Sequence, residues 1–281
     1  MTPLVVAAVL AAAVAHAVWN ALAHTIRDQL VAFTLIGGGA AVLGAVVACF
    51  APLPAGGAWP YLAVSALLHV GYQMLLMRSF SLGDFGQVYP IARGTAPLVV
   101  TAAAVLLVGE SLSGLALAGV ALASAGLSGV ALWGLRGSRP HWPALAAAVA
   151  TGLSIAAYTV VDGVGVRASG TPLGYIAWLM VLEGVLIPAW AFRVHRGALW
   201  TALRPHAARG LAGAALSMLA YGLVLWAQTR APLAPVAALR ESSVIIGAAI
   251  GALFFHERFG TPRIAATTLL TLGTTLILTA G

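Results

Sequence analysis

Two stretches of the chain decide how it folds: residues 93–110, RGTAPLVVTAAAVLLVGE, and residues 240–257, RESSVIIGAAIGALFFHE. Each stretch begins with an arginine, continues through an apolar run and ends with a glutamate. The two arginines lie 147 positions apart, the two glutamates repeat that offset, and so do Gly126 and Gly273. Agreement of three residue pairs at one offset indicates that the chain consists of two related halves.

Similar apolar runs fill the rest of the chain, separated by short segments rich in Pro, Gly or Arg. Each run has about the 20 residues that a helix needs to cross a bilayer. Because a helix satisfies its own backbone hydrogen bonds in hydrocarbon, we expect an all-α integral membrane fold with ten transmembrane helices. The expected spans are residues 4–23, 30–50, 60–79, 86–108, 112–133, 143–161, 172–192, 209–229, 233–255 and 263–280.

The composition agrees with a membrane fold and argues against several other classes of protein. Of the 281 residues, 61% are hydrophobic and 7% are charged, whereas soluble domains carry about 25% charged residues. The net charge of +7 comes from arginines scattered between apolar runs, without the clustered basic face that nucleic acid binding requires. The single Cys49 lies in an apolar run and is expected to be a small buried thiol.

The sequence contains none of the patterns that carry enzyme chemistry. It has no nucleophile with a base and an orienting acid at recognisable spacing, no phosphate-binding glycine loop and no metal-ligand spacing. We therefore expect no enzyme, no cofactor and no metal site.

The two halves are predicted to be residues 1–136 and residues 137–281, with five spans each. An odd number of spans forces the second half to enter the membrane in the opposite sense, which gives the inverted repeat typical of secondary transporters. Trp19-Asn20 also corresponds to Tyr158-Thr159 at a somewhat shorter offset.

The motifs at the ends of two apolar runs resemble those of a known family. Val-Gly-Glu-Ser at 108–111 and Phe-His-Glu-Arg at 255–258 close the fourth and ninth runs. With the two five-helix halves and the chain length, they resemble the EamA-type branch of the drug/metabolite transporter superfamily over essentially the whole chain. HAVWNAL at 16–22, YPIARGTAP at 89–97 and RESS at 240–243 are similar to a subgroup found beside phosphonate-utilisation genes.

Arg93 and Arg240 are the first candidates for substrate binding, because each lies about two turns inside its apolar run. A charge at that depth is costly and usually faces a bundle interior or a wet cavity. A guanidinium offers forked donors to an anionic group. The alternative is structural: each arginine is locked to a carboxylate or to helix carbonyls.

Polar stripes on apolar helices supply further candidates, because such stripes must turn away from lipid. Interhelical hydrogen bonding alone would also explain them. The candidates for substrate binding beside the two arginines are Tyr89, His16, Trp19, Asn20, His69, Tyr72, Gln73 and Tyr158.

Two carboxylates are candidates for proton coupling. Glu183 lies in the middle of an apolar run, where it could take up and release a proton during transport, and Glu241 follows Arg240 directly. The alternative for Glu183 is an ion pair with Arg93 or Arg240. The small proton-coupled drug exporters of the same superfamily use a glutamate in their first helix, which this sequence lacks there.

Together these features predict a secondary transporter that moves a small polar, anionic or zwitterionic metabolite across the bacterial inner membrane by alternating access. An exporter of amino acids or of cationic or hydrophobic drugs is the alternative, and a membrane-embedded enzyme is a further class. The expected partners are the solute, the lipid bilayer and protons as a candidate coupling ion. No nucleic acid partner is expected, and the chain is expected to be a monomer or a homodimer.

The orientation follows from the arginines between the spans. The odd-numbered loops hold ten of them, and the even-numbered loops hold Arg167 and Arg230. By the positive-inside rule, the odd-numbered loops are cytoplasmic and both termini lie outside. The family resemblance implies the opposite, with both termini in the cytoplasm.

Single cysteines distinguish the two orientations. After replacement of Cys49 by Ala, Ala55→Cys is expected to react with an impermeant thiol reagent in intact cells, and Trp200→Cys is not. Both positions should react in permeabilised cells. Labelling at 200 but not at 55 would contradict the charge count and favour the orientation that the resemblance implies.

Overall fold

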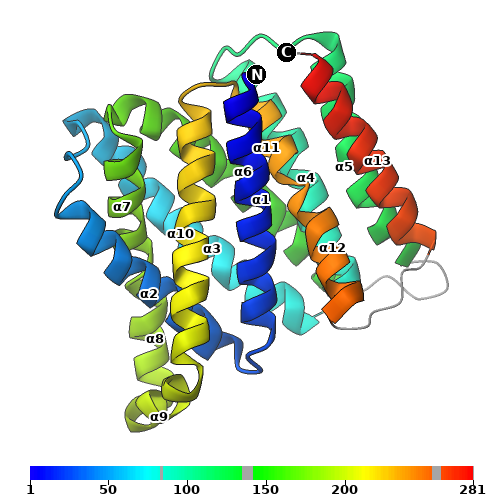
Figure 1. Ribbon diagram of the computed structural model, residues 1–281. Coiled ribbons are helices and arrows are strands. Elements are labelled where there is room, and N and C mark those ends of the chain that lie inside the picture. Colours follow the sequence, from blue (N-terminus) through cyan, green and yellow to red (C-terminus); the bar gives the residue numbers. More distant parts are fainter. Residues whose placement is uncertain (83–84, 135–141, 255–260, 281) are drawn as a thin grey trace. The chain divides into compact units, whose positions relative to one another are not determined.

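The computed structural model describes residues 1–82, 85–134, 142–254 and 261–280, and in these ranges the chain is built of α-helices, short 3-10 turns and loops, without a strand (Figure 1). The predicted all-α class is confirmed for this part of the chain. The helices are α1 (Pro3–His24), α2 (Gln29–Ala48), α3 (Trp59–Leu82), α4 (Phe85–Leu106), α5 (Gly114–Gly134), α6 (Trp142–Ser169), α7 (Pro172–Glu183), α8 (Leu186–His195), α9 (Leu199–Leu203), α10 (Ala207–Gln228), α11 (Leu233–Arg240), α12 (Ser243–Phe254) and α13 (Thr261–Thr279).

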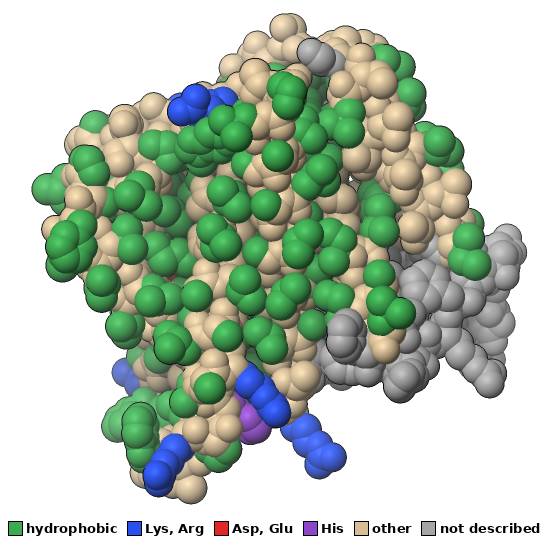
Figure 2. Space-filling model, viewed as in Figure 1, with side chains coloured by type: hydrophobic (Ala, Val, Ile, Leu, Met, Phe, Trp, Pro, Cys, Tyr) green, Lys and Arg blue, Asp and Glu red, His purple; other side chains and the backbone are tan. Residues whose placement is uncertain are grey.

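Several of these helices can cross a membrane. In the described residues, five stretches are long and apolar enough: Pro3–Ala23, Gln29–Ala48, Gly56–Arg78, Trp142–Ser169 and Pro172–Gln228, the last of which holds more than one helix. Shorter apolar helices lie at Ile91–Leu106, Gly114–Gly129 and Ile264–Thr279. The face shown in Figure 2 is covered by hydrophobic side chains along the helices, with Arg near helix ends. The chain is a multi-pass membrane protein.

Seven of the predicted spans agree with a single helix to within three residues at each end, and three do not. The sixth span was predicted to end at residue 161, but α6 continues to Ser169 and so includes Asp162 and Arg167. The seventh and ninth spans are each divided into two helices.

The division of the seventh span has a proline as its cause. α7 ends at Glu183 and α8 begins at Leu186. Pro188 has no backbone N–H, so it cannot donate to the carbonyl of Gly184, and its ring disfavours a regular helix over the preceding turn. The amide of Gly184 still donates to the carbonyl of Met180 at 3.0 Å. The backbone is thus interrupted immediately after a carboxylate.

The ninth span is divided at Glu241 and Ser242, again beside a charged residue. Here the amides of Glu241 and Ser242 donate three residues back, to Ala238 at 3.1 Å and to Leu239 at 3.1 Å. Such tight turns replace the regular helical pattern between α11 and α12.

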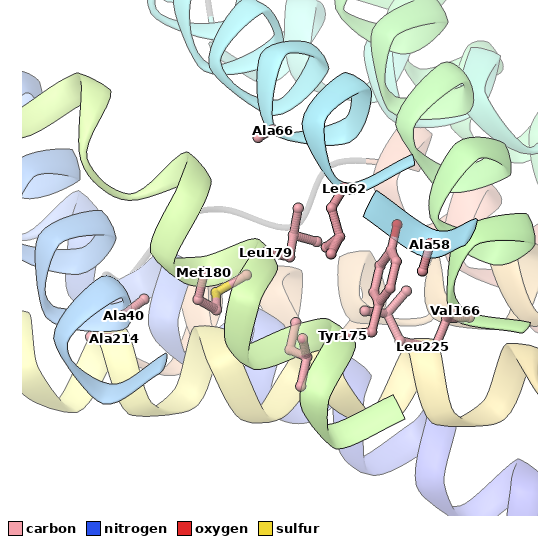
Figure 3. Packing of buried hydrophobic residues seen from close by; sticks show 11 residues of the cluster. Ala40, Ala58, Leu62, Ala66, Val166, Tyr175, Leu179, Met180, Ala214 and Leu225 are labelled. Atoms are coloured by element: carbon pink, nitrogen blue, oxygen red, sulfur yellow. The ribbon is translucent and has the colours of Figure 1, made fainter. Parts of the chain in front are cut away.

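The chain separates into two compact units, and each contains segments of both predicted halves. Unit 1 comprises residues 1–10, 71–160 and 230–281; unit 2 comprises residues 11–70 and 161–229. In unit 2, α2 packs against α7, α8 and α10. The buried core of this unit is drawn in Figure 3 and consists of Ala40, Ala58, Leu62, Ala66, Val166, Tyr175, Ile176, Leu179, Met180, Ala214 and Leu225.

One expectation about this region is wrong. Cys49 follows the last residue of α2 and is exposed, not buried. Its thiol donates to the carbonyl of Ala45 at 3.3 Å.

In unit 1, α5 and α13 lie side by side and pack closely through glycines (Figure 1). A Cβ on Gly126 would lie 2.9 Å from the carbonyl oxygen of Ala266, and a Cβ on Gly273 would lie 2.6 Å from that of Gly119. As α5 advances from Gly119 to Gly126, its contacts on α13 move backward, so the two helices are antiparallel. Small residues at such contacts let two helix backbones approach.

The α5–α13 contact yields a prediction for stability. In Gly119→Ala, the new Cβ would lie 2.7 Å from both the carbonyl oxygen of Gly273 and Cγ1 of Ile277. Overpacking of this kind costs about 1 to 3 kcal/mol. We expect a lower midpoint of thermal unfolding in detergent.

Gly129→Ala is the matched control, because Gly129 lies on the same helix and is exposed, and a Cβ added there would meet no other atom within 4 Å. This substitution should leave the midpoint unchanged or slightly raise it, since Ala is the better helix former. Equal effects of the two substitutions would contradict close packing at Gly119.

Candidate functional site

A buried ion pair joins α4 to the interruption between α11 and α12 in unit 1. Nε of Arg93 lies 2.7 Å from Oε2 of Glu241, and a terminal nitrogen of Arg93 donates to Oγ of Ser243 at 3.2 Å. The side chain of Arg93 is 3% exposed and that of Glu241 is fully buried. The structural alternative for Arg93, an ion pair with a carboxylate, is therefore present, with Glu241 as the partner.

The turn of α4 that carries Arg93 is held by close backbone contacts. A Cβ on Gly152 of α6 would lie 2.7 Å from the carbonyl oxygen of Ala92, and a Cβ on Gly94 would lie 3.0 Å from Cβ of Leu127 on α5. These approaches fix the backbone on both sides of Arg93. The guanidinium is thus presented from a rigid segment.

Arg240 belongs to the same cluster but is held less closely. It is 4% exposed, and its nearest guanidinium nitrogen lies 3.8 Å from Oε1 of Glu241. Its Nε has no hydrogen-bond partner within the described part of the chain. Because an arginine stays charged in proteins, this buried guanidinium can accommodate a further acceptor.

The repeat explains why the cluster carries more positive than negative charge. At the 147-residue offset, Arg93 corresponds to Arg240, but Glu241 corresponds to Gly94, which has no side chain. The repeat therefore supplies two guanidinium groups and one carboxylate. Among the described residues, Glu241 is the carboxylate that ion-pairs with both arginines.

A second buried polar cluster lies in unit 2 and centres on Asp162 of α6. The hydroxyl of Tyr175 donates to Oδ1 of Asp162 at 2.9 Å, and the hydroxyl of Tyr221 donates to Oδ2. Asp162 is fully buried. Three helices, α6, α7 and α10, thus meet at one carboxylate.

His69 and Glu183 adjoin this cluster. Nδ1 of His69 lies 3.6 Å from Oε2 of Glu183, and its ring packs edge-on against that of Tyr221 with 5.3 Å between the ring centroids. Oγ of Ser65 lies 3.1 Å from Nδ1 of His69. We call Ser65, His69, Asp162, Tyr175, Glu183 and Tyr221 the Asp162 cluster.

The predicted stripe on α1 forms contacts within its own helix. Nε1 of Trp19 donates to Nδ1 of His16 at 3.3 Å, and the side-chain amide of Asn20 donates to the carbonyl of His16 at 2.8 Å. Both bonds are local and join residues three and four positions apart on α1. The role of the three residues in substrate binding stays a prediction.

The remaining candidates fall in unit 1. Tyr72 and Tyr158 pack edge-on, with ring centroids 5.5 Å apart, and Gln73 beside them is half-buried. The side chain of Tyr89 lies outside the described residues. The structure therefore brings together Arg93, Arg240 and Glu241, then His69 and Glu183, and then the two tyrosines.

Sequence reasoning missed Asp162 and Ser243. Asp162 was passed over because the sixth span was predicted to end one residue earlier. A carboxylate directly after an apolar run is itself a signal, since the helix can continue when other helices supply donors. No group of three or more His, Cys, Asp or Glu side chains that could hold a metal ion occurs in the described residues.

Comparisons with known proteins agree with the resemblance to EamA-type transporters. Residues 142–279 match the EamA-like transporter family. A solved structure titled only "Crystal structure of protein" aligns over 100% of this chain and 98% of its own, with a TM-score of 0.73 and 18% sequence identity. At that identity the likeness shows the fold alone. The search of curated proteins finds no match.

The ion pair of Arg93 with Glu241 gives a stability prediction. Glu241→Gln would leave two buried guanidinium groups without a carboxylate, and breaking a buried pair costs about 3 to 5 kcal/mol. We expect a large fall in the thermal unfolding midpoint. Adding Arg93→Gln should recover part of the loss, because the buried net charge returns to its original value.

Glu110→Gln is the matched control in the same unit. Both carboxylate oxygens of Glu110 accept from the amide of Leu233 at the start of α11, at 3.0 and 2.8 Å. A glutamine keeps one accepting oxygen, so the loss of stability should be about 1 kcal/mol. If the Glu241→Gln protein were as stable as the unmodified protein, this result would contradict the ion-pair assignment.

Proposed function

We propose that this chain is an EamA-type secondary transporter of the bacterial inner membrane, which moves a small anionic or zwitterionic metabolite by alternating access. The observation that carries the proposal is the buried excess of positive charge at Arg93 and Arg240. Charge in an apolar surrounding is expensive unless another group meets it. An anionic group of the solute supplies the missing negative charge when it is bound.

Within this site, we assign different roles to the two arginines. Arg93 is held at 2.7 Å by Glu241 and contributes mainly to the stability of the site. Arg240 lies 3.8 Å from the same carboxylate and has a buried Nε without a partner in the described residues. Arg240 is thus the better donor to a solute. The phosphonate-associated motifs make phosphonates the first anions to test.

Ten membrane helices in two inverted halves are part of the proposal, and the α5–α13 contact supports them. At the 147-residue offset, the contact of Gly126 with Ala266 corresponds to the contact of Gly273 with Gly119. The repeat offset thus converts each of the two contacts into the other, which is typical of two segments related by a two-fold axis. Corresponding helices that run antiparallel are what an inverted repeat requires.

A binding screen tests the substrate class. We expect methylphosphonate or another small anion to raise the thermal unfolding midpoint of the purified protein, because a ligand that binds only the folded state stabilises it. Alanine represents zwitterions and choline represents quaternary amines. Flux of the stabilising solute into protein-containing liposomes separates a transporter from a protein that only binds. Stabilisation by choline and not by anions would contradict the proposal and favour a cation exporter.

Arg240→Gln tests the site itself. Gln keeps a donor but loses the charge, and a hydrogen bond to a charged group contributes about 1.5 to 3 kcal/mol. Affinity for the anion should therefore fall roughly ten- to hundredfold. The exposed Arg230 is the matched control, and Arg230→Gln should leave the affinity unchanged. Unchanged affinity in Arg240→Gln would remove Arg240 from the site.

A further inference from the structure

The Asp162 cluster contains two carboxylates that differ in their surroundings, and the side chain of Asp162 is fully buried whereas that of Glu183 is 12% exposed. Both oxygens of Asp162 accept a tyrosine hydroxyl, so a proton on either oxygen would weaken a hydrogen bond that this oxygen already accepts. Glu183 is the opposite case. Its Oε2 is buried and has no hydrogen-bond partner in the described residues. Glu183 is therefore the carboxylate that has room for a proton.

His69 faces that same oxygen. Its Nδ1 lies 3.0 Å from the carbonyl oxygen of Ser65 and 3.6 Å from Oε2 of Glu183. Both of these oxygens are hydrogen-bond acceptors, so the tautomer of His69 with a hydrogen on Nδ1 is favoured. The imidazole is neutral when Nε2 carries no hydrogen. With the hydrogen on Nδ1 in place, the pair can still take up one proton at Oε2 of Glu183.

The elements packed around the pair contribute few other titratable or charged groups. α2 has no titratable residue between Gln29 and Ala48. α6 contributes Asp162 and also Arg167, whose Nε donates to the carbonyl of Gln228 at 2.8 Å. α7 contributes Tyr175, and α10 contributes Tyr221 near the pair and Arg209 in its first turn. The basic residues of α8, Arg193 and His195, lie in its last turn.

Asp162 acts on this pair through Tyr221. The hydroxyl of Tyr221 is bound by Asp162, and its ring packs edge-on against the ring of His69. Asp162 thereby fixes the tyrosine that orients the imidazole. Asp162 and Tyr221 are positioning residues for the pair.

We propose that His69 and Glu183 form the proton-binding site of this transporter, and that one proton is bound and released there in each transport cycle. The inference rests on the proposed function for its link to transport, but proton binding itself does not depend on the solute. On binding, an O–H bond forms at Oε2 of Glu183 and the negative charge is cancelled. On release, the proton passes to water and the carboxylate is restored beside neutral His69.

The location gives the proton a means to act on the backbone. Glu183 is the last residue of α7, directly before the interruption at Gly184. Gly184 is packed against the backbone of Gly37 on α2. A change of charge at Glu183 therefore occurs where α7, α8 and α2 meet.

Infrared difference spectroscopy in membranes tests proton binding without any solute. When the pH is lowered from about 9 to about 5, a range that lies above the ordinary pKa of glutamate, the unmodified protein should gain a carboxylic acid band that Glu183→Gln lacks. Tyr221→Phe should keep the band and shift its midpoint pH, because the pair loses its orientation. A band of equal intensity in Glu183→Gln would overturn the proposal.

Asp28→Asn is the matched control, because Asp28 also lies beside a histidine: Oδ2 is 3.5 Å from Nε2 of His195. Asn can still accept the amides of Leu30 and Val31 that Asp28 caps, and Asn is an equally good N-cap. The difference band that Glu183→Gln removes should persist in Asp28→Asn. If Asp28→Asn also lost the band, the band could not be assigned to the His69–Glu183 pair.

Flux completes the test. In liposomes, uptake of the anion found by the binding screen should respond to an imposed pH gradient, and Glu183→Gln should abolish that response. Flux in Glu183→Gln that still follows the gradient would overturn the coupling role. An unmodified protein that transports none of the tested solutes would contradict the proposed function, while the infrared band would still decide whether Glu183 binds a proton.

Discussion

A charge inside an apolar helix bundle has to be met by another polar or charged group, because hydrocarbon supplies no water to it. The described part of this protein is organised around that requirement. Arg93 is met by Glu241 and Ser243, and Asp162 is met by two tyrosines. The contacts of Arg93 with Glu241 and of Asp162 with Tyr221 join helices that are distant in sequence. The buried charges therefore contribute, with the apolar side chains, to which helices lie together.

The same requirement applies to the backbone, and here the two clusters share a feature. Glu183 lies at the interruption between α7 and α8, and Glu241 lies at the interruption between α11 and α12. Irregular backbone at membrane depth is tolerated where it is buried in protein or lines a wet cavity. Interrupted helices also mark the binding sites of many secondary transporters. The coincidence of broken helices with buried carboxylates thus connects the architecture to the proposed chemistry.

The helix positions could be read from the sequence because length and hydropathy determine them, and α2 and α10 lie within two residues of the predicted spans. The interruptions could not, since one depends on Pro188 acting on Gly184 and the other on a local turn at Glu241. The carboxylate that pairs with Arg93 could not be predicted, because no sequence pattern indicates a contact between α4 and the turn that joins α11 to α12. Asp162 escaped notice because Tyr175 and Tyr221, which allow α6 to continue past it, are recognisable as its partners only in three dimensions.

The missing donor at Pro188 has a mechanical consequence. In an uninterrupted helix, bending stretches or breaks at least one backbone hydrogen bond, and the helix resists as a stiff rod. Between α7 and α8 the bond from residue 188 to the carbonyl of Gly184 does not exist in any conformation, so a tilt of α8 against α7 sacrifices nothing there. The segment is therefore a flexible joint, and its flexibility follows from the covalent structure of proline. Its stiffness is set by side-chain packing on α2, which a single substitution at Gly37 or Gly184 can alter.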